Sequence, residues 1–296
     1  MKARPDNFSV KLLKTTTFVL LLFGLQTVLG QSIPLPNGFA HNDYRHRHPL
    51  FDALENGYVN IEADIFLHGK KLIIAHINPF FKNDRTLETL YLKPLADRIA
   101  GNKGQVYRGY TSPVILMIDI KTGALRTYPV LKLLLEKYRT ILSVYDHGQI
   151  YPGPVMVVLS GNKPYDAIKN EENRLAFIDE DLRNTYRDTA ANCVYEMSSC
   201  KYSKLLKWRG GGAIPADEED TLRNYVAEAH RFGKKVRLWA SPENHAVWDE
   251  LLKCGVDLIN TDKLAELKNF LLTRNGSYAS AVEPAPKTMG TSMLTF

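Results

Sequence analysis

The sequence predicts an α/β protein with a single-domain TIM (β/α)8 barrel. Strand-like and helix-like segments alternate along its 296 residues. Several strands are continuous apolar runs, which is typical of a parallel sheet buried on both faces. Seven or eight such units fit the roughly 250 residues of this fold. An open doubly wound sheet is the alternative, and the lack of a Gly-rich dinucleotide turn after the first strand counts against it.

The first half of the chain alternates between strands and helices. Strands are expected at 38–42, 58–67, 113–121 and 154–160, with 71–76 extending the second strand or pairing with it. Helices are expected at 49–56, 86–100 and 125–142. In the second of these, Leu87, Leu90 and Leu95 recur at the spacing of one helix face.

The second half continues the pattern with shorter strands. Strands are expected at 175–178, 193–197, 235–240 and 256–260, and helices at 217–232 and 264–272. Acids at 217–220 favour the first turn of a helix, and Gly233 ends it. Ser241 is expected to cap a further helix, with Pro242 at its first position. Residues 31–273 form the barrel in this interpretation, and 274–296, rich in Ser, Pro, Ala and Thr, form a flexible tail.

Residues 1–30 have the pattern of a secretory signal peptide. Basic residues precede a short apolar run from Phe18 to Leu29, and Val28 and Gly30 are small enough for a cleavage site. An uncleaved signal anchor is the alternative, although the run is short for a membrane span. The pattern predicts a secreted or periplasmic protein.

The charge of the chain is less informative than it first appears. The formal net charge is +6, but four basic residues and one acid lie within residues 1–30, which leaves +3 for the rest. This weak excess argues against a nucleic-acid partner. The composition, 45% hydrophobic and 24% charged, excludes a disordered or collagen-like chain. Cys193 and Cys200 could form a disulfide after export or remain free thiols, and Cys254 would be left over.

Ionisable residues gather at the C-terminal ends of consecutive strands. His41 and Asn42 end the first strand, and His76 ends the segment at 71–76. Glu62 and Asp64 are two residues apart, and so are Asp119 and Lys121; residues two apart on a strand share one face. In a barrel these strand ends meet at one mouth, where such enzymes place their chemistry.

This set of side chains suits phosphodiester cleavage. Three clustered carboxylates repel one another unless a cation neutralises them, and oxygen ligands favour one divalent cation, Mg²⁺ or Ca²⁺. A divalent ion and a lysine stabilise phosphate oxygens. Two histidines can act as general base and general acid on either side of phosphorus, activating water or a hydroxyl of the substrate itself.

The ordered motifs resemble the PI-PLC-like phosphodiesterase superfamily, which includes glycerophosphodiester phosphodiesterases and sphingomyelinase D-like phospholipases. The motifs are HND at 41–43, IEADI at 61–65, AH at 75–76 and IDIK at 118–121. Residues 85–95 resemble the helix that follows the second histidine, and the nearest subgroup is the one named after "altered inheritance of mitochondria protein 6". The resemblance is firm over 41–121 and thin thereafter.

The resemblance implies a role for each motif residue. It implies a TIM barrel with a cation held by Glu62, Asp64 and Asp119. It makes His41 and His76 the acid–base pair, with Lys121 on the phosphate, Asn42 orienting the phosphate or the ion, and Trp239 lining the mouth. Typical glycerophosphodiesterases read His-Arg-Gly where this chain reads HND, and a glutamate where it has Asp119, which is closer to the sphingomyelinase D pattern. These departures leave the substrate open.

We therefore expect an exported hydrolase for a glycerophosphodiester or a phospholipid head group, with at most transient contact with a membrane surface. A lyase that releases a cyclic phosphate and a non-catalytic barrel that binds head groups are the alternatives. A carbohydrate-active barrel would need two carboxylates but no essential lysine or histidine pair. The sequence leaves the oligomeric state open.

Overall fold

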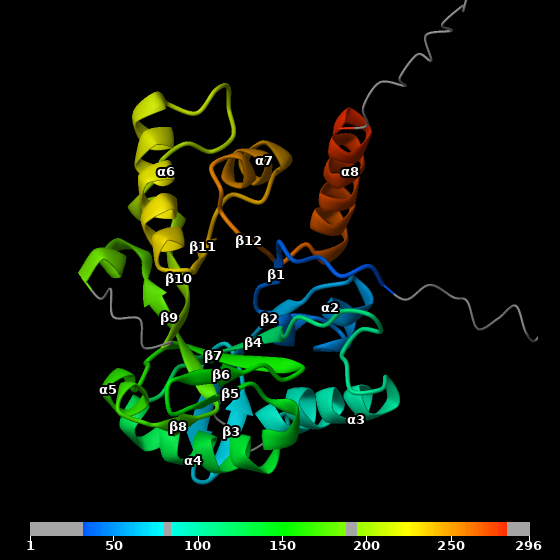
Figure 1. Ribbon diagram of the computed structural model, residues 1–296, viewed down its shortest axis with the longest axis vertical. Helices are drawn as coiled ribbons and strands as arrows, with labels where there is room; N and C mark the ends of the chain where they lie inside the picture. The colour runs from blue at the N-terminus through cyan, green and yellow to red at the C-terminus, as the bar shows by residue number, and fades with distance from the viewer. Residues whose placement is uncertain (1–31, 80–83, 188–193, 283–296) are drawn as a thin grey trace, which may run out of the picture.

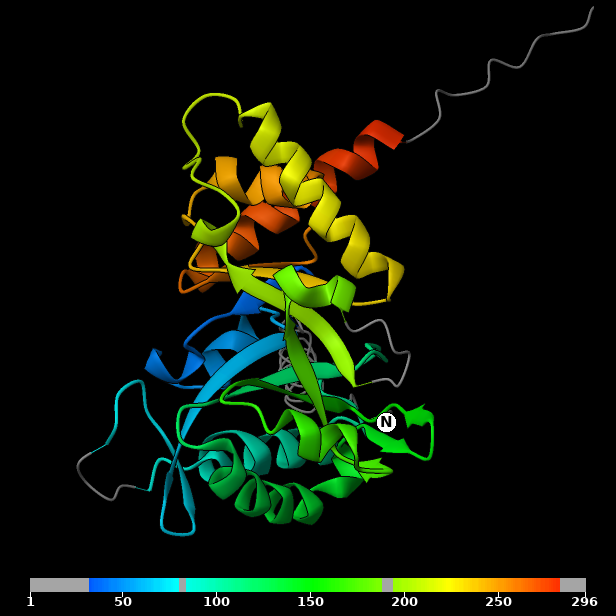
Figure 2. The ribbon, with the colours of Figure 1, turned by 90° about the vertical axis from the view of Figure 1, so that its left-hand side faces the viewer.

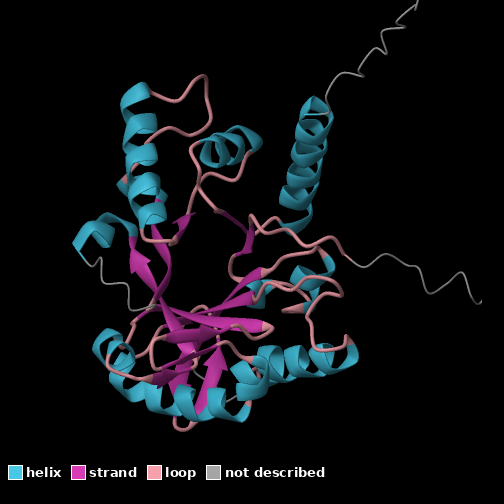
Figure 3. Cartoon of the chain, in the orientation of Figure 1, coloured by secondary structure: helices cyan, strands magenta, loops and turns pink. Residues whose placement is uncertain are grey.

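The computed structural model describes residues 32–79, 84–187 and 194–282, with side chains as far as 274 except at 186 and 187. Its centre is a closed barrel of eight parallel strands, in which β1 pairs with both β2 and β12. In their order around the barrel these are β1 (Gly38–Ala40), β2 (Asn60–His68), β4 (Val114–Ile120), β7 (Val155–Gly161), β9 (Ala176–Asp181), β10 (Tyr195–Lys201), β11 (Lys235–Trp239) and β12 (Leu258–Thr261). Figure 3 shows the strands gathered at the centre and the helices outside them. The predicted TIM barrel is confirmed.

In strand β4, alternate side chains point into the barrel and outward to the helices. Ile115 and Met117 belong to the cluster that fills the barrel interior, whereas Leu116 and Ile118 belong to the larger cluster between strands and helices. Because successive side chains point to opposite faces, Asp119 is the next inward position after Met117. The apolar interior therefore gives way to a carboxylate at the C-terminal end of the strand.

The helices cover the outer face of the barrel. They are α2 (Phe51–Glu55), α3 (Lys93–Gly101), α4 (Ala124–Lys137), α5 (Tyr165–Lys169), α6 (Ala216–Arg231), α7 (His245–Lys253) and α8 (Leu264–Val282). Figures 1 and 2 show α6, α7 and α8, coloured yellow to red, on one side of the molecule and α3 and α4 on the opposite side. Short turns complete the connections: η2 (Asp43–Arg45), η4 (Arg139–Ile141), η5 (Leu182–Arg187), η6 (Tyr202–Lys204) and the π-helical turn η3 (Glu88–Leu92).

Two small additions lie outside the eight-stranded ring. β3 (Lys71–Ile74) pairs antiparallel with β2, so the segment at 71–76 forms a hairpin with the second strand rather than extending it. β5 (Val144–Asp146), β6 (Gln149–Tyr151) and β8 (Asn173–Arg174) form a separate three-stranded sheet that the sequence did not predict. These strands have two or three residues each, which is too short to show a periodic pattern.

The structure corrects three predicted element boundaries. Helix α7 is capped by Asn244, whose side chain accepts a hydrogen bond from the Val247 amide at 3.0 Å, so the prediction of a cap at Ser241 is wrong. Strand β10 continues to Lys201 because its polar second half pairs along its length with β11. Helix α8 runs to Val282, beyond the predicted end at 272.

Several predictions fall on residues outside those that the structure describes. The signal peptide at 1–30, Cys193 and the tail beyond 282 are among them. Cys200 and Cys254 are buried free thiols. Within the described ranges, none of the helices combines the length and apolarity that crossing a bilayer would need.

Candidate active site

All eight residues predicted for the site line one cavity at the C-terminal ends of the barrel strands. Its volume is about 480 Å³, within the usual range for a small-molecule site. The eight are His41, Asn42, Glu62, Asp64, His76, Asp119, Lys121 and Trp239. Trp239 is 40% exposed at the mouth. The barrel thus brings together residues nearly 200 positions apart, and their chemical roles remain predictions.

The three predicted metal ligands lie close together at the base of this cavity. Asp64 and Asp119 are paired positions on neighbouring strands β2 and β4, and Glu62 is two residues before Asp64 on the same face. One oxygen atom from each carboxylate lies within 4.8 Å of the other two. Glu62 and Asp64 are buried. The register of two adjacent strands therefore creates the cluster.

Lysine 121 partly neutralises this carboxylate cluster. Its Nζ lies 2.8 Å from Asp119 Oδ2 and 3.1 Å from Asp64 Oδ2. Burial nevertheless raises the pKa of Asp64, with a contribution from the charge of Glu62 that the Tyr44 hydrogen bond and Lys121 do not offset. Asp119 Oδ1 is buried without a hydrogen-bond partner among the described residues. An all-oxygen donor set with an unpartnered atom and incomplete charge balance fits Mg²⁺ or Ca²⁺.

Glu62 is held by a buried arginine that the sequence analysis missed. Arg237 on β11 places Nη2 3.3 Å from Glu62 Oε1, and its Nε donates to Asn260 Oδ1 at 2.9 Å. Burial opposes ionisation of Glu62, but Arg237, His41 and the Asn42 amide together lower its pKa. Arg237 is two residues before Trp239 on the same strand, so period-two reasoning could have placed it inside the barrel.

His41 forms a carboxylate–imidazole pair with Asp262. His41 Nδ1 lies 2.7 Å from Asp262 Oδ1, and Nε2 lies 3.6 Å from Glu62 Oε2. Burial lowers the pKa of His41, but the hydrogen bond from Nδ1 to Asp262 and the charges of Glu62 and Asp262 outweigh it and raise the pKa overall. Asp262 follows the last strand, and it fixes the ring so that Nε2 faces the carboxylate cluster.

His76 is oriented by Tyr44. The Tyr44 hydroxyl lies 2.9 Å from His76 Nδ1, 2.7 Å from Asp64 Oδ2 and 2.6 Å from Asn42 Oδ1. A single hydroxyl hydrogen cannot serve both oxygens, so the hydroxyl donates to one of them and its oxygen can accept a hydrogen bond from the N–H of Nδ1. Tyr44 directly follows the HND motif but was not predicted as a site residue, because an aromatic residue there reads as ordinary packing.

The far side of the cavity comes from the later strands and is also new. Ser160 Oγ donates to Asp179 Oδ2 at 3.0 Å, and Asp179 Oδ1 is buried without a partner among the described residues. Burial raises the pKa of Asp179. Lys163, Arg183, Lys201 and Lys204 line the same side. The expected strand at 175–178 stopped one residue short of Asp179, although Asp179 and Asp181 repeat the spacing of Glu62 and Asp64.

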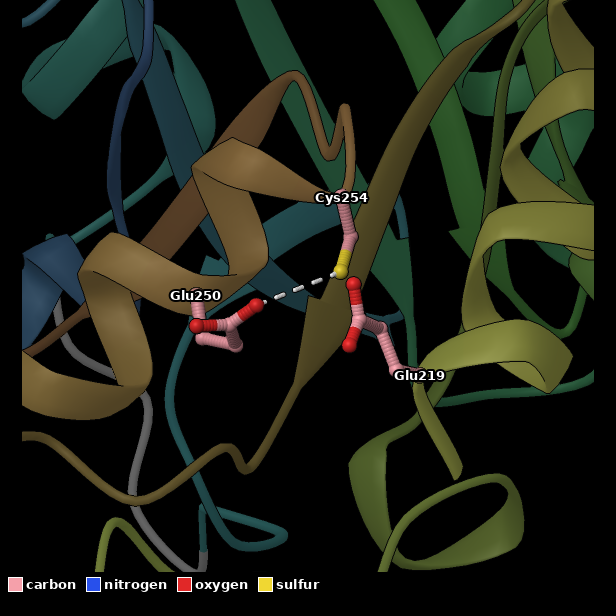
Figure 4. Close-up of side chains that lie close together, drawn as sticks. All are labelled: Glu219, Glu250 and Cys254. Atoms are coloured by element: carbon pink, nitrogen blue, oxygen red, sulfur yellow. Dashed lines mark hydrogen bonds between the residues drawn. The ribbon is translucent and has the colours of Figure 1, made fainter. Parts of the chain in front are cut away.

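A second group of potential ligands lies outside the cavity, between α6 and α7 (Figure 4). Cys254 Sγ lies 3.9 Å from Glu250 Oε1, and Glu219 accepts two hydrogen bonds from Arg223. Lys253 Nζ is 3.7 Å from Glu250. Burial raises the pKa of Cys254 to about 11, so the thiol is protonated at neutral pH. With its carboxylates already facing cations, this group lacks the charge imbalance of the cavity cluster.

Comparison with protein families adds an independent observation. Residues 28–179 match the AIM6-like phosphodiesterase domain, which covers half of the chain and all of the motifs before β9. The chain belongs to the AIM6-like phosphodiesterase family. Residues 235–265, which carry Arg237, Trp239 and Asp262, match the glycerophosphoryl diester phosphodiesterase family. The domain is therefore of phosphodiesterase type.

Fungal relatives of this AIM6-like chain share most of its length. "Altered inheritance of mitochondria protein 6" from Eremothecium gossypii is 31% identical over 280 residues, covering 82% of this chain and 71% of the relative. The homolog from Arthroderma benhamiae is 26% identical, with 80% and 84% covered. The Saccharomyces cerevisiae protein of the same name is 28% identical, with 76% and 68% covered. The similarity extends past the motif region to the later strands.

Proposed function

We propose that this AIM6-like protein is a metal-dependent phosphoric diester hydrolase that acts on a glycerophosphodiester or a phospholipid head group. The observation that carries the proposal is one cavity holding an oriented imidazole on each side of a carboxylate cluster. His41 lies beside Glu62, and His76 lies 3.6 Å from Asp64 through its Nδ1. Lys121 completes the arrangement between Asp64 and Asp119.

The residues of the chain supply the proton transfers. One imidazole takes a proton from the attacking water as its oxygen bonds to phosphorus, and the other donates a proton to the leaving alcohol as its P–O bond breaks. Asp262 holds the tautomer of His41, and Tyr44 orients His76. The Lys121 ammonium faces the negative charge that develops on the non-bridging oxygens.

The carboxylates of Glu62, Asp64 and Asp119 would hold the divalent cation. Their oxygen donors, and the unpartnered Asp119 Oδ1, suit Mg²⁺ or Ca²⁺ rather than a soft metal. When bound, such an ion stabilises negative charge on the phosphate.

A panel of phosphodiesters with and without EDTA tests this function. We expect turnover with Mg²⁺ or Ca²⁺, its loss in EDTA, and a drop of at least ~100-fold for His41→Ala or His76→Ala with the fold retained. A lack of turnover on every substrate with either metal, while head groups still bind, would favour a non-catalytic binding barrel. Phosphorus NMR separates hydrolysis from a cyclising lyase, because only the lyase releases a cyclic phosphate.

We further propose that the protein is exported, on the basis of the signal-peptide pattern in residues 1–30. Expression of the full chain followed by N-terminal sequencing of the secreted or periplasmic product should give a mature end near residue 31. Retention of Met1 on a membrane-associated product would instead indicate an uncleaved anchor.

A further inference from the structure

The cavity is electrically divided between its two sides. The first side, from the strands up to β4, carries the histidines and the carboxylate cluster with Lys121. The second side, from the end of β10 and the segments after β7, β9 and β10, contributes four cationic side chains, namely Lys163, Arg183, Lys201 and Lys204. The proposed reaction gives the first side a task but leaves the second side without one.

Two of these four cations are already engaged within the protein. Arg183 makes two hydrogen bonds to the carboxylate of Asp181, at 2.6 Å and 3.0 Å. Lys163 donates to the backbone carbonyl of Asp179. Their charges are therefore committed largely to the barrel rim itself.

Lys201 and Lys204 are not balanced in this way. Both are exposed, and neither forms an ion pair with a carboxylate in the described part of the chain. Lys201 lies at the end of β10 with its Nζ 5.7 Å from the centre of the Trp239 ring, and Lys204 is held close by in the short turn η6. The remaining carboxylates on this side are those of Asp181, which Arg183 already pairs with, and Asp179, whose pKa burial raises.

An excess of positive charge at this place disfavours a cationic head group. Quaternary ammonium groups are recognised by cages of several aromatic faces. Trp239 is the one Phe, Tyr or Trp side chain among the described residues that line the cavity, and its ring already lies beside an ammonium group. Ammonium groups instead bind phosphate and carboxylate as point charges.

We propose that Lys201 and Lys204 form a second anion-binding subsite, so that the preferred substrate is a phosphodiester whose alcohol carries a further phosphate or carboxylate. This inference rests on the proposed function for its substrate, but the subsite itself is a binding property. One phosphate would lie at the carboxylate cluster with Lys121, and the second anionic group would lie at the mouth beside Trp239.

A matched substrate series tests the subsite. Glycerophosphocholine, glycerophosphoglycerol and phosphorylated glycerophosphoglycerol share the scissile diester and differ in a cationic, a neutral or an anionic head group. We expect kcat/KM to rise along the series. We expect Lys201→Met and Lys204→Met each to lower the ratio of kcat/KM for the anionic over the neutral substrate by roughly tenfold, as for loss of one charged hydrogen bond.

Lys207→Met is the matched control, because Lys207 is an exposed lysine three residues after Lys204 that does not line the cavity. It removes the same charge and should leave the ratio unchanged. The ratio should also fall with added salt in the wild-type protein. An equal rate on all three head groups, or the same loss for the Lys207 control as for the subsite variants, would overturn the subsite.

Binding measurements separate this inference from the proposed catalysis. Calorimetry with glycerol 1,3-bisphosphate and glycerol 3-phosphate measures binding without turnover. We expect the bisphosphate to bind more tightly, and we expect this difference to disappear when Lys201 and Lys204 are both replaced by Met. That result supports the subsite even if no diester is cleaved. Equal affinity for the two ligands refutes it even if diesters are cleaved. Phosphatidylglycerophosphate and phosphatidylglycerol in phosphatidylcholine vesicles repeat the comparison for lipid substrates. A preference for the anionic head group seen only with the soluble diesters, or only with the lipids, shows which of the two carries the anionic group that the subsite binds.

Discussion

At the scale of single residues, the site depends on side chains that orient other side chains. Neither catalytic histidine of the proposed mechanism stands alone: Asp262 fixes His41, and the Tyr44 hydroxyl faces His76. Such partners contribute by holding a ring in one orientation and one tautomer. Asp262 and Tyr44 act through the histidines and not on the reacting atoms, so a search of the sequence for catalytic residues does not select them.

Tyr44→Phe tests this orienting role. The ring stays buried, but His76 Nδ1 and Asp64 Oδ2 lose the hydroxyl, so we expect kcat to fall roughly 10–100-fold with little change in the unfolding midpoint. If the effect runs through Asp64 instead, saturating metal will restore kcat. Tyr128→Phe is the control, because its hydroxyl donates to Glu171 away from the cavity.

The buried carboxyl of Asp43 should make the stability of the protein depend on pH. Burial raises its pKa to about 6, although the Leu50 amide and the Tyr91 hydroxyl donate to it. Because the folded protein favours the protonated form, stability from this group is full below pH ~4 and is lost as the pH rises through about 6.

Urea unfolding of the wild type and Asp43→Asn at several pH values measures this effect. The free energy of unfolding of the wild type should fall relative to the variant by roughly 3 kcal/mol between pH 4 and pH 7. A difference that does not vary with pH would show that the carboxyl titrates normally in the folded state.

At the scale of elements, strand register and one glycine set the position of the predicted metal ligands. Asp64 and Asp119 face each other because β2 and β4 are in register, and Asp119 in turn is paired with Ser160 on β7. Gly161, at the end of β7, has φ +68°, and an added Cβ would lie 2.0 Å from Asp119 Oδ1. Only a glycine at position 161 therefore leaves room for the Asp119 carboxylate beside the end of β7.

Gly161→Ala should displace the Asp119 carboxylate and weaken binding of Mg²⁺ or Ca²⁺ by about tenfold or more. Gly233→Ala is the matched control, since Gly233 has φ +69° with nothing within 4 Å of an added Cβ. Both variants should lose roughly 1–2 kcal/mol of stability through backbone strain. Calorimetric metal affinity should fall only in the first; an equal affinity in both would contradict the close approach.

At the scale of the whole molecule, the closed barrel places a buried cation beside a buried carboxylate. Arg237 and Glu62 come from β11 and β2, on opposite sides of β1 and β12, and are both almost fully buried. Each charge compensates the other, which offsets the cost of holding both almost fully out of water.

Arg237→Met should leave Glu62 uncompensated and lower the free energy of unfolding by about 3–5 kcal/mol. Added Mg²⁺ or Ca²⁺ should restore part of this loss, because a bound cation would neutralise Glu62. Lys234→Met is the control, since Lys234 pairs with buried Glu180 at 2.5 Å and neither lines the cavity. Thermal unfolding with and without metal measures both; equal recovery in the two variants would count against Glu62 as a ligand.

The sequence by itself determined the barrel and the first half of the site. Apolar strands in alternation with amphipathic helices specify a buried parallel sheet. The polar residues at 41–42, 76 and 119–121 interrupt that pattern at or just after strand ends, and those at 62 and 64 interrupt it on one face of the second strand. Local periodicity was enough to assign these residues to one mouth. The helix cap at Asn244 and the extent of β10 were not predictable in the same way, because Ser241 fits the local rule equally well and the second half of β10 is polar.

Only the tertiary structure decided how these residues work together. The contacts of Arg237 with Glu62, Asp262 with His41 and Tyr44 with His76 join positions from 32 to 221 residues apart. The basic side of the cavity depends on the same closure, because Lys201 and Lys204 read as ordinary surface lysines until the barrel brings them to the cavity that holds the carboxylates. The interaction between charges depends on their distance in the folded protein, and the order of residues along the chain says little about that distance.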